Sequence, residues 1–312
     1  MRVLIIGGSG FVGSALVPRL KQEGHDVSLL NRGSRPISGV KQFIADRDDP
    51  AALATEGAEF DAVIDTSSYT GEQTRLAFEV FGSQTGRWIH LSSAAVYRGP
   101  SGTLPSESDP VGGADVWGEY GREKSHADQY LLTQTQTPVA IIRPPYLYGP
   151  LNDLDRERFI WSRVLSSRPV IVPGVGDAAI QFLYINDLAD LFALLLKAQL
   201  KDQNIYNAAN AETFSLLDWV REVAAITQIE PKIFLGDEVA PGFPARAYFP
   251  FRDTQCALSV GAAADDLGWQ AEHSLREGLK KTFQTYSPTA LKSSSPTTEA
   301  EQSVVLSGET RR

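Results

Sequence analysis

Two residues of the chain, Tyr120 and Lys124, have types and a spacing that suit proton transfer. They stand four positions apart in a segment that predicts a helix over 117–133, so their side chains share one helix face. A phenol has a pKa of about 10 and is a poor base at neutral pH, but a neighbouring ammonium group lowers that pKa. Ser93 adds a hydroxyl that could hold a substrate oxygen during the transfer. We therefore predict Ser93, Tyr120 and Lys124 as the catalytic residues.

The first residues of the chain predict a phosphate-binding turn. Arg2–Ile6 is a short, β-branched apolar run, which predicts a buried strand, and an apolar helical pattern begins at Phe11. Glycines between a strand and a helix make a tight turn and let the backbone approach a pyrophosphate, which the free N–H groups of the helix bind. The alternative is a turn that only joins the two elements. We predict dinucleotide binding by Gly7, Gly8, Ser9, Gly10, Phe11, Val12 and Gly13.

The end of the second predicted strand, Asp26–Leu30, indicates which dinucleotide binds. Asn31 and Arg32 follow this strand, where NAD-binding folds normally have an acidic residue on the ribose 2′-hydroxyl. A guanidinium group pairs well with phosphate, so Arg32 favours the 2′-phosphate of NADP. We therefore predict NADP as the cofactor, with NAD as the alternative. A solvated surface arginine is the alternative for Arg32.

Further cofactor contacts are predicted at the ends of the next two strands. Asp46, after the strand over 40–45, is placed to accept from the adenine amino group, with Arg47 stacked on the ring. An ordinary charged turn is the alternative for this pair. The strand over 60–65 is followed by two hydroxyl side chains that would line the cofactor edge, Thr66 and Ser67.

The order of elements predicts the fold class. Apolar strands alternate with amphipathic helices, which is typical of an α/β protein with a doubly wound parallel sheet. We predict a dinucleotide-binding Rossmann domain over 1–150 with 176–205 added to it. A smaller C-terminal α/β substrate-binding part is predicted over 151–175 and 206–286. Residues 287–312 are rich in Ser and Thr with few aromatic residues, so we predict a disordered tail.

Composition narrows the partners. The net charge of −9 disfavours bulk attraction to nucleic acid or an anionic membrane. One Cys and four scattered His argue against an intramolecular disulfide and a Cys/His metal cluster, so we predict no metal. No signal or transit segment is visible, and the most apolar helix, Leu188–Leu196, contains Asp190 and is too short to span a bilayer. We expect a cytoplasmic protein with a small-molecule substrate, no membrane partner and the capacity to form a homodimer, and the charge disfavours a nucleic-acid partner.

Taken together, these motifs resemble the extended short-chain dehydrogenases/reductases of the epimerase/dehydratase branch. The resemblance spans about residues 1–285 and implies that Tyr120 is the acid/base, Lys124 contacts the nicotinamide ribose and Ser93 orients the substrate. It also implies that the backbone at Pro144 borders the nicotinamide ring. The segments that carry the resemblance are Gly7–Gly13, Ser92–Tyr97, Tyr120–Lys124, Arg143–Pro150 and Asp187–Ala189.

Three segments are also similar to the chloroplast stem-loop-binding proteins and their bacterial relatives. They are Asn31–Gly33, Tyr148–Pro150 and Phe249–Asp253. This resemblance implies stem-loop RNA binding as an alternative function. The plastid proteins have an eroded Tyr–Lys pair, whereas this chain retains the pair together with its serine. An active enzyme is therefore the preferred interpretation.

The substrate is the least determined part of the prediction. Sugar-nucleotide epimerases often have a late arginine on the substrate diphosphate, so Arg163 and Arg252 are candidates, with Tyr148 as a further substrate contact. Ion pairs are the alternative for both arginines. Dehydration is the least favoured reaction, because Ala94 and Ala95 stand where a dehydratase needs an Asp-Glu pair. We predict an NAD(P)-dependent epimerase or reductase that acts on an alcohol or carbonyl carbon of a sugar nucleotide or similar polar substrate.

Overall fold

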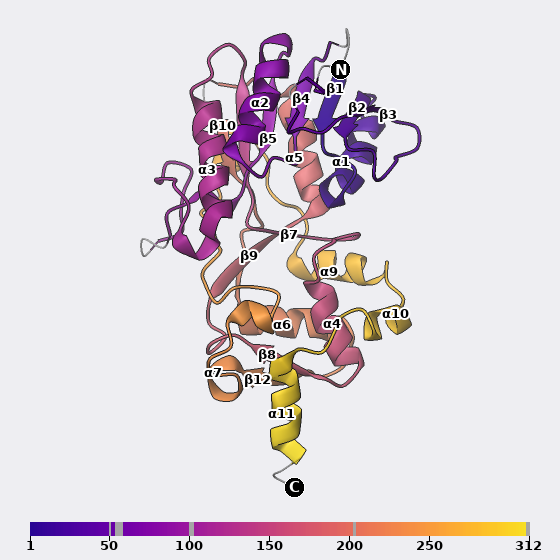
Figure 1. Ribbon diagram of the computed structural model, residues 1–312, viewed down its shortest axis with the longest axis vertical. Coiled ribbons are helices and arrows are strands. Elements are labelled where there is room, and N and C mark those ends of the chain that lie inside the picture. Colours follow the sequence, from indigo (N-terminus) through magenta and orange to yellow (C-terminus); the bar gives the residue numbers. More distant parts are fainter. Residues whose placement is uncertain (50, 54–58, 100–102, 202–203, 310–312) are drawn as a thin grey trace. The chain divides into compact units, whose positions relative to one another are not determined.

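The computed structural model describes residues 1–312 except 50, 54–58, 100–102, 202–203 and 310–312. These residues form two compact units (Figure 1). The first unit contains Met1–Leu147, Leu183–Ala211 and Ala257–Glu272, and the second contains Tyr148–Phe182, Glu212–Cys256 and His273–Arg312. The main differences from the predicted domains are that 176–182 belong to the second unit, and that 206–211 and 257–272 belong to the first.

A seven-stranded sheet forms the centre of the first unit. Its strands are β1 (Arg2–Ile6), β2 (Asp26–Asn31), β3 (Lys41–Ile44), β4 (Ala62–Asp65), β5 (Trp88–Leu91), β6 (Val139–Arg143) and β10 (Asn204–Asn207). Their order is β10-β6-β5-β4-β1-β2-β3, and every pair is parallel. The order reverses between β1 and β4, which is the point where sheets of this kind bind ligands. The fold is therefore the doubly wound α/β fold that the sequence predicts.

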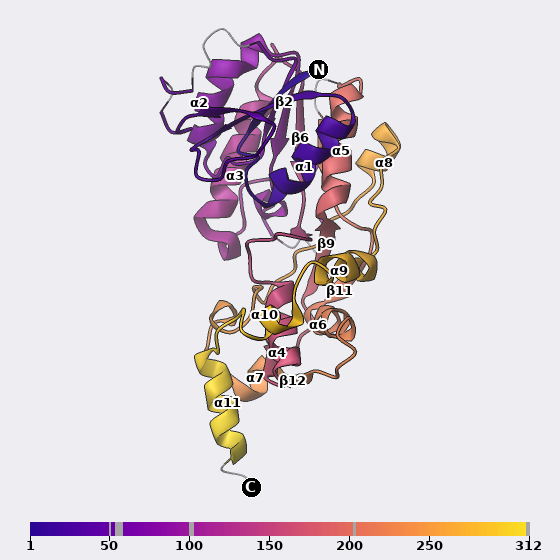
Figure 2. The same cartoon turned by 90° about the vertical axis from the view of Figure 1, so that its right-hand side faces the viewer.

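Helices cover both faces of this sheet. The main ones are α1 (Phe11–Gln22), α2 (Gly71–Phe81), α3 (Gly118–Leu132) and α5 (Ile185–Lys197), with the short α8 (Ala262–Leu267) near β10. Figure 2 shows α2 and α3 on one side of the sheet and α1 and α5 on the other. Val3 and Ile5 pack in the cluster with α1 and α5, whereas Leu4 and Ile6 pack in the cluster with α2 and α3. Because successive strand residues face opposite ways, a sheet covered on both faces requires such a continuous apolar run.

The second unit is built around stacked and edge-on aromatic rings. Phe182 and Trp219 stack with their ring centroids 5.8 Å apart, and Phe251 meets Trp219 edge-on at 4.7 Å. The parallel pair β8–β12 lies in this unit, and the three-stranded sheet β11-β9-β7 includes the points where the chain passes between units. The strands are β7 (Tyr146–Tyr148), β8 (Pro169–Val172), β9 (Ala179–Tyr184), β11 (Thr213–Ser215) and β12 (Lys232–Leu235). The helices are α4 (Glu157–Leu165), α6 (Leu216–Ala225), α7 (Gly236–Val239), α9 (Leu275–Phe283), α10 (Pro288–Lys292) and α11 (Glu299–Glu309).

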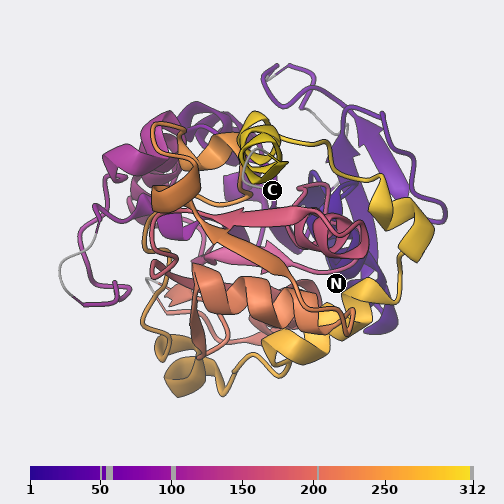
Figure 3. The same cartoon turned by 90° about the horizontal axis from the view of Figure 1, so that it is seen from below.

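The predicted disorder of residues 287–312 is wrong for their described part, which forms α10 and α11. Figure 3 shows α11 in yellow, nearly end-on, beside the C-terminal label. Leu291 and Ala300 are buried, and the buried carboxylate of Glu301 forms ion pairs with Arg163 and Arg168. A few anchoring side chains thus order a segment whose composition is polar. Residues 310–312 lie outside the described residues.

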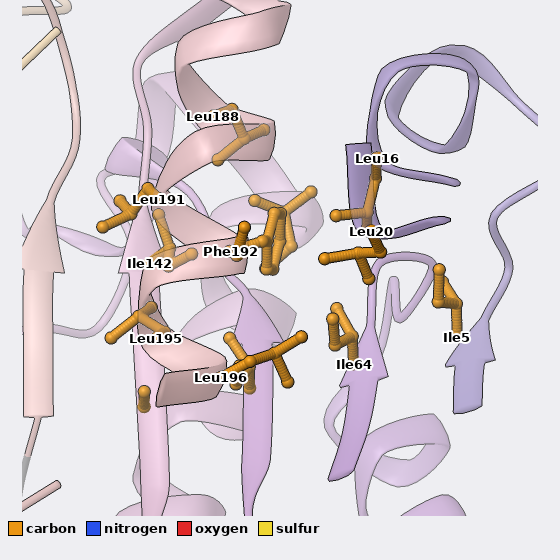
Figure 4. Packing of buried hydrophobic residues seen from close by; sticks show 14 of the residues in the cluster. Ile5, Leu16, Leu20, Ile64, Ile142, Leu188, Leu191, Phe192, Leu195 and Leu196 are labelled. Carbon is orange, nitrogen blue, oxygen red and sulfur yellow. The ribbon is translucent and has the colours of Figure 1, made fainter. Parts of the chain in front are cut away.

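One apolar cluster holds α1 and α5 against the sheet. Leu16 and Leu20 of α1 belong to it with Leu188, Leu191 and Leu195 of α5, as Figure 4 shows. This packing fixes the helix that follows the glycine turn.

In the part of the chain that the structure describes, no helix is both long and apolar enough to cross a bilayer.

Candidate active site

The glycine turn between β1 and α1 fits a dinucleotide. Gly7 and Gly8 have φ angles of 95° and 75°, which side chains other than glycine rarely adopt. A Cβ atom on Gly13 would overlap the carbonyl oxygen of Gly8, so α1 begins directly against the turn. Among the residues that the structure describes, no side chain caps α1, and its first turn holds no acidic residue. Its N-terminal N–H groups can therefore donate hydrogen bonds to the oxygens of a pyrophosphate.

Residues predicted for the adenosine end of the cofactor lie at the ends of β2 and β3. Arg32 and Asp46 are exposed, and Asn31 is partly buried. The side-chain oxygen of Asn31 accepts from the N–H of Gly33 at 2.8 Å, which shapes the turn that carries Arg32. The Asp46 carboxylate accepts from the N–H of Asp48 at 3.1 Å. Their cofactor contacts stay a prediction.

The guanidinium of Arg47 binds side chains of the protein, whereas the sequence predicts that it stacks on the adenine ring. Its Nη1 and Nη2 atoms donate to the two carboxylate oxygens of Asp65, each at 2.9 Å, and Nη1 also donates to Ser67 Oγ at 2.8 Å. Asp65 ends β4 and is fully buried. Burial opposes ionisation of this carboxyl, but the charge of Arg47 outweighs it and lowers the pKa of Asp65 to about 2.

The Arg47–Asp65 pair supports the glycine turn. A Cβ on Gly7 would come within 2.7 Å of Ser67 and 2.8 Å of Thr66, so these predicted cofactor residues lie against the turn. The sequence did not predict a role for Asp65, because an acidic residue at the end of an apolar strand shows only where the strand ends.

A close approach of two elements brings the Ser93 segment and α3 together. Ser93 follows β5 and accepts from the N–H of Ala95 at 3.2 Å, which opens the short 3₁₀ helix η2 (Ala94–Val96). A Cβ on Gly121 would lie 2.6 Å from the carbonyl oxygen of Ala95, so glycine permits this approach of α3 to η2. Tyr120 and Lys124 are carried on the same helix. The three predicted catalytic residues thus come from two elements in direct contact.

Lys124 is buried, whereas the side chain of Tyr120 is 41% exposed. The Lys124 ammonium donates to the carbonyl oxygen of Leu91 at 2.7 Å, which uses one of its three donors. Burial lowers the pKa of Lys124 to about 8, while the carboxylates of Asp65 and Asp128 oppose that shift. The contact of Lys124 with a ribose hydroxyl and its effect on the phenol of Tyr120, one helical turn away, stay predictions.

A second buried polar network lies behind the Ser93 segment. The carbonyl oxygen of Pro144, predicted to border the nicotinamide, accepts from the N–H of Ala94 at 2.8 Å. Arg143 beside it is buried and donates to Asp128 at 2.8 Å and to the Tyr97 hydroxyl at 3.0 Å. The local sequence predicts that a strand ends at Arg143. It does not predict the hydrogen-bond partners of Arg143, Asp128 and Tyr97, which lie 15 and 46 positions away.

The three residues predicted to contact substrate from the second unit have different surroundings. Tyr148 is 1% exposed, and its hydroxyl donates to the carbonyl oxygen of Ser274 at 3.3 Å. Arg163 is fully buried and donates to Glu301 at 2.6 Å and to Ser295 at 3.0 Å. Internal contacts therefore replace the predicted substrate contacts at Tyr148 and Arg163. Arg252 is exposed.

Comparison with known proteins fits this geometry. Residues 3–209 match the model of the NAD dependent epimerase/dehydratase family. The chain belongs to this family. A similar curated relative is the chloroplast stem-loop binding protein of 41 kDa b of Arabidopsis thaliana, which is 30% identical over 90% of this chain and 78% of the relative.

Two solved structures share the fold. The dTDP-glucose 4,6-dehydratase of Bacillus anthracis in complex with NAD has a TM-score of 0.78 at 16% identity, covering 93% of this chain and 97% of that one. The UDP-glucose 4-epimerase of Thermotoga maritima with UDP-glucose has a TM-score of 0.75 at 18% identity, covering 91% and 98%. The predicted resemblance to extended short-chain dehydrogenases/reductases of this branch is confirmed.

Proposed function

We propose that the protein is an NAD(P)-dependent epimerase or reductase that acts on an alcohol or carbonyl carbon of a sugar nucleotide or similar small polar substrate. The observation that carries this proposal is the contact between α3 and η2, which associates Tyr120 and Lys124 with the Ser93 segment. Family membership supports it, as do fold neighbours described with UDP-glucose and with NAD.

In the proposed reaction Tyr120 moves the proton. Its Oη atom takes the proton of the substrate hydroxyl, or returns it, while Ser93 Oγ holds the same substrate oxygen. The ammonium of Lys124 lowers the pKa of the phenol and donates to the nicotinamide ribose. When bound, the nicotinamide ring would accept and return the hydride of the substrate carbon.

The proposed cofactor is NADP in preference to NAD. The uncapped N-terminus of α1 would hold the pyrophosphate, and the exposed Arg32 would pair with the 2′-phosphate. The carboxylate of Asp46 would accept a hydrogen bond from the adenine amino group. Further proposed contacts are Asn31, Thr66, Ser67 and Pro144 for the cofactor and Arg252 for the substrate.

We do not extend to this chain the stem-loop binding for which the Arabidopsis relative is named. The chain has Ser93, Tyr120 and Lys124 in adjoining elements, and its net charge of −9 disfavours an RNA backbone. Strong binding of stem-loop RNA that weakens steeply with salt and is unchanged in Tyr120→Phe would reverse this choice.

The decisive experiment has two steps. Mass spectrometry of small molecules released from the purified protein identifies bound cofactor and substrate. Calorimetric titration with NADP and NAD then gives both affinities. The proposal requires one dinucleotide to bind below millimolar concentration and a substrate that turns over with it. If neither dinucleotide binds, the glycine turn is only structural and the enzyme proposal fails.

A further inference from the structure

Three buried polar side chains and the partly buried Arg47 lie close together near the candidate site. Arg47 follows β3, Asp65 ends β4, His90 lies in β5 and Lys124 lies in α3. Arg47 holds both oxygens of Asp65, and His90 Nδ1 is 4.0 Å from Asp65 Oδ2. Lys124 in turn donates to the carbonyl oxygen of Leu91, the residue next to His90. Four separate segments thus place their charged or titratable groups in one interior region.

His90 lies among these side chains as a neutral group. Burial and the charges of Lys124 and Arg47 together lower the pKa of His90 to about 3, and the charge of Asp65 opposes this shift. Neither ring nitrogen has a hydrogen-bond partner among the described residues. His90 therefore lies close to Asp65, and within the electrostatic influence of Lys124, without carrying charge at neutral pH.

The charged groups around Lys124 act on it in opposite directions. The carboxylates of Asp65 and Asp128 favour its ammonium form, whereas the guanidinium of Arg47 disfavours it. Tyr120 stands one helical turn away on the same face. Asp128 also receives a hydrogen bond from Arg143, so each carboxylate near Lys124 is shared with an arginine.

We propose that Asp65 is a positioning residue for Lys124, whose ammonium it keeps charged inside the protein, and that Arg47 sets how strongly Lys124 feels this carboxylate. The functional meaning of this coupling rests on the proposed role of Lys124. The coupling itself is a property of the protein without cofactor. Arg47 also binds Ser67, which packs against Gly7, so the same ion pair links Lys124 to the phosphate-binding turn.

The test measures the titration of Lys124 directly. The chain has nine lysines, so NMR spectra of protein labelled with ¹³C at lysine Cε are simple enough to resolve. The signal that disappears in Lys124→Arg belongs to Lys124. In the unaltered protein its midpoint is expected near pH 8. Asp65→Asn should lower the midpoint by about one pH unit or more, because a neighbouring opposite charge is lost.

Variants that remove the charge of Arg47 should shift the Lys124 midpoint in the opposite direction from Asp65→Asn. Arg47→Met should raise the Lys124 midpoint, and Arg47→Lys should keep it near the unaltered value because a cation remains. Glu301→Gln is the matched control, since it breaks a buried ion pair in the other unit and should leave the midpoint unchanged. General loosening of the fold would not shift the Lys124 midpoint in opposite directions in Asp65→Asn and Arg47→Met.

The proposal is overturned if Asp65→Asn and Arg47→Met shift the midpoint in the same direction, or if neither shifts it. Should Asp65→Asn fail to fold, the Arg47 variants decide: a midpoint that does not rise in Arg47→Met overturns the proposal. Adding NADP and, separately, NAD to the unaltered protein separates the two proposals. If neither dinucleotide moves the Lys124 signal, Lys124 does not contact the cofactor and the proposed function fails, whatever the cofactor-free spectra show.

Discussion

The carbonyl oxygen of Gly8 occupies the space that a Cβ atom of residue 13 would need, so α1 meets the glycine turn through a residue with no side chain. Gly10, three positions earlier, has no atom within 4 Å of such a Cβ. The glycines of one motif therefore have different reasons. Gly13 is required by packing within the protein, whereas a side chain at Gly10 would point into open space beside the turn.

Gly13→Ala should destabilise the protein by about 1–3 kcal/mol, because the added methyl group forces α1 away from the turn. Dinucleotide affinity should fall with it. Gly10→Ala should leave the free energy of unfolding close to the unaltered value, and any loss of dinucleotide affinity would then report the approach of the pyrophosphate. Urea unfolding and calorimetry measure both quantities. Equal stability of the two variants would contradict the packing role of Gly13.

Glu301→Gln should destabilise the second unit by about 3–5 kcal/mol, because Arg163 would keep its burial but lose its charge partner. The control is Glu222→Gln, which breaks the more exposed pair between Glu222 and Arg276 and should change stability by about 1 kcal/mol or less. Urea unfolding compares the two. If Glu301→Gln is no worse than Glu222→Gln, the carboxylate does not anchor α11.

Local patterns in the sequence predicted the sheet and the helix that carries Tyr120 and Lys124. The run Val3–Ile6 shows its buried strand directly, and the spacing of Tyr120 and Lys124 depends only on the helix that carries them. The predicted helix over 117–133 is observed as α3 (Gly118–Leu132). Such features are determined within one turn or one strand.

Contacts between distant segments could not be predicted in this way. Arg47 and Asp65 are 18 positions apart: Arg47 follows β3 and Asp65 ends β4, and strands β2 and β1 lie between these two in the sheet. Arg163 and Glu301 are 138 positions apart. In each case the local sequence shows only a charged residue, and the partner is fixed by the tertiary arrangement.

Acid should destabilise the protein through His90. The folded state keeps this ring neutral until about pH 3, whereas the unfolded chain protonates it near pH 6.5. Between these values the unfolded state binds one more proton, so stability falls as pH decreases, by about 1.4 kcal/mol per pH unit. His90→Gln should reduce that slope by the contribution of one bound proton. His126→Gln removes an exposed histidine and should leave the slope unchanged. Urea unfolding from pH 7 to pH 4 gives the slopes; an unchanged slope in His90→Gln would show that His90 protonates equally in both states.

Arg32→Gln tests the proposed choice of cofactor. Arg32 is exposed at the end of β2, so its loss should not affect folding. NADP affinity should fall by about tenfold or more, since a charge-assisted hydrogen bond to phosphate is lost, while NAD affinity should stay the same. Calorimetric titration of the variant with both dinucleotides measures the change. An equal loss for both, or tighter NAD binding by the unaltered protein, would mean that Arg32 does not select the 2′-phosphate.

Tyr120→Phe separates the proposed chemistry from the fold, because it keeps the ring and removes only the hydroxyl. General acid–base catalysis contributes typically about 10²–10⁴-fold, so turnover of the substrate found in the bound-ligand experiment should fall by roughly that factor. Cofactor affinity should change little. Lys124→Met should weaken both turnover and cofactor binding, since it removes the ribose contact and the charge that lowers the phenol pKa. Steady-state kinetics and calorimetry on the two variants distinguish these effects. Full turnover in Tyr120→Phe would require another group, Ser93 or a water molecule, to move the proton, and the proposed role of Tyr120 would be wrong.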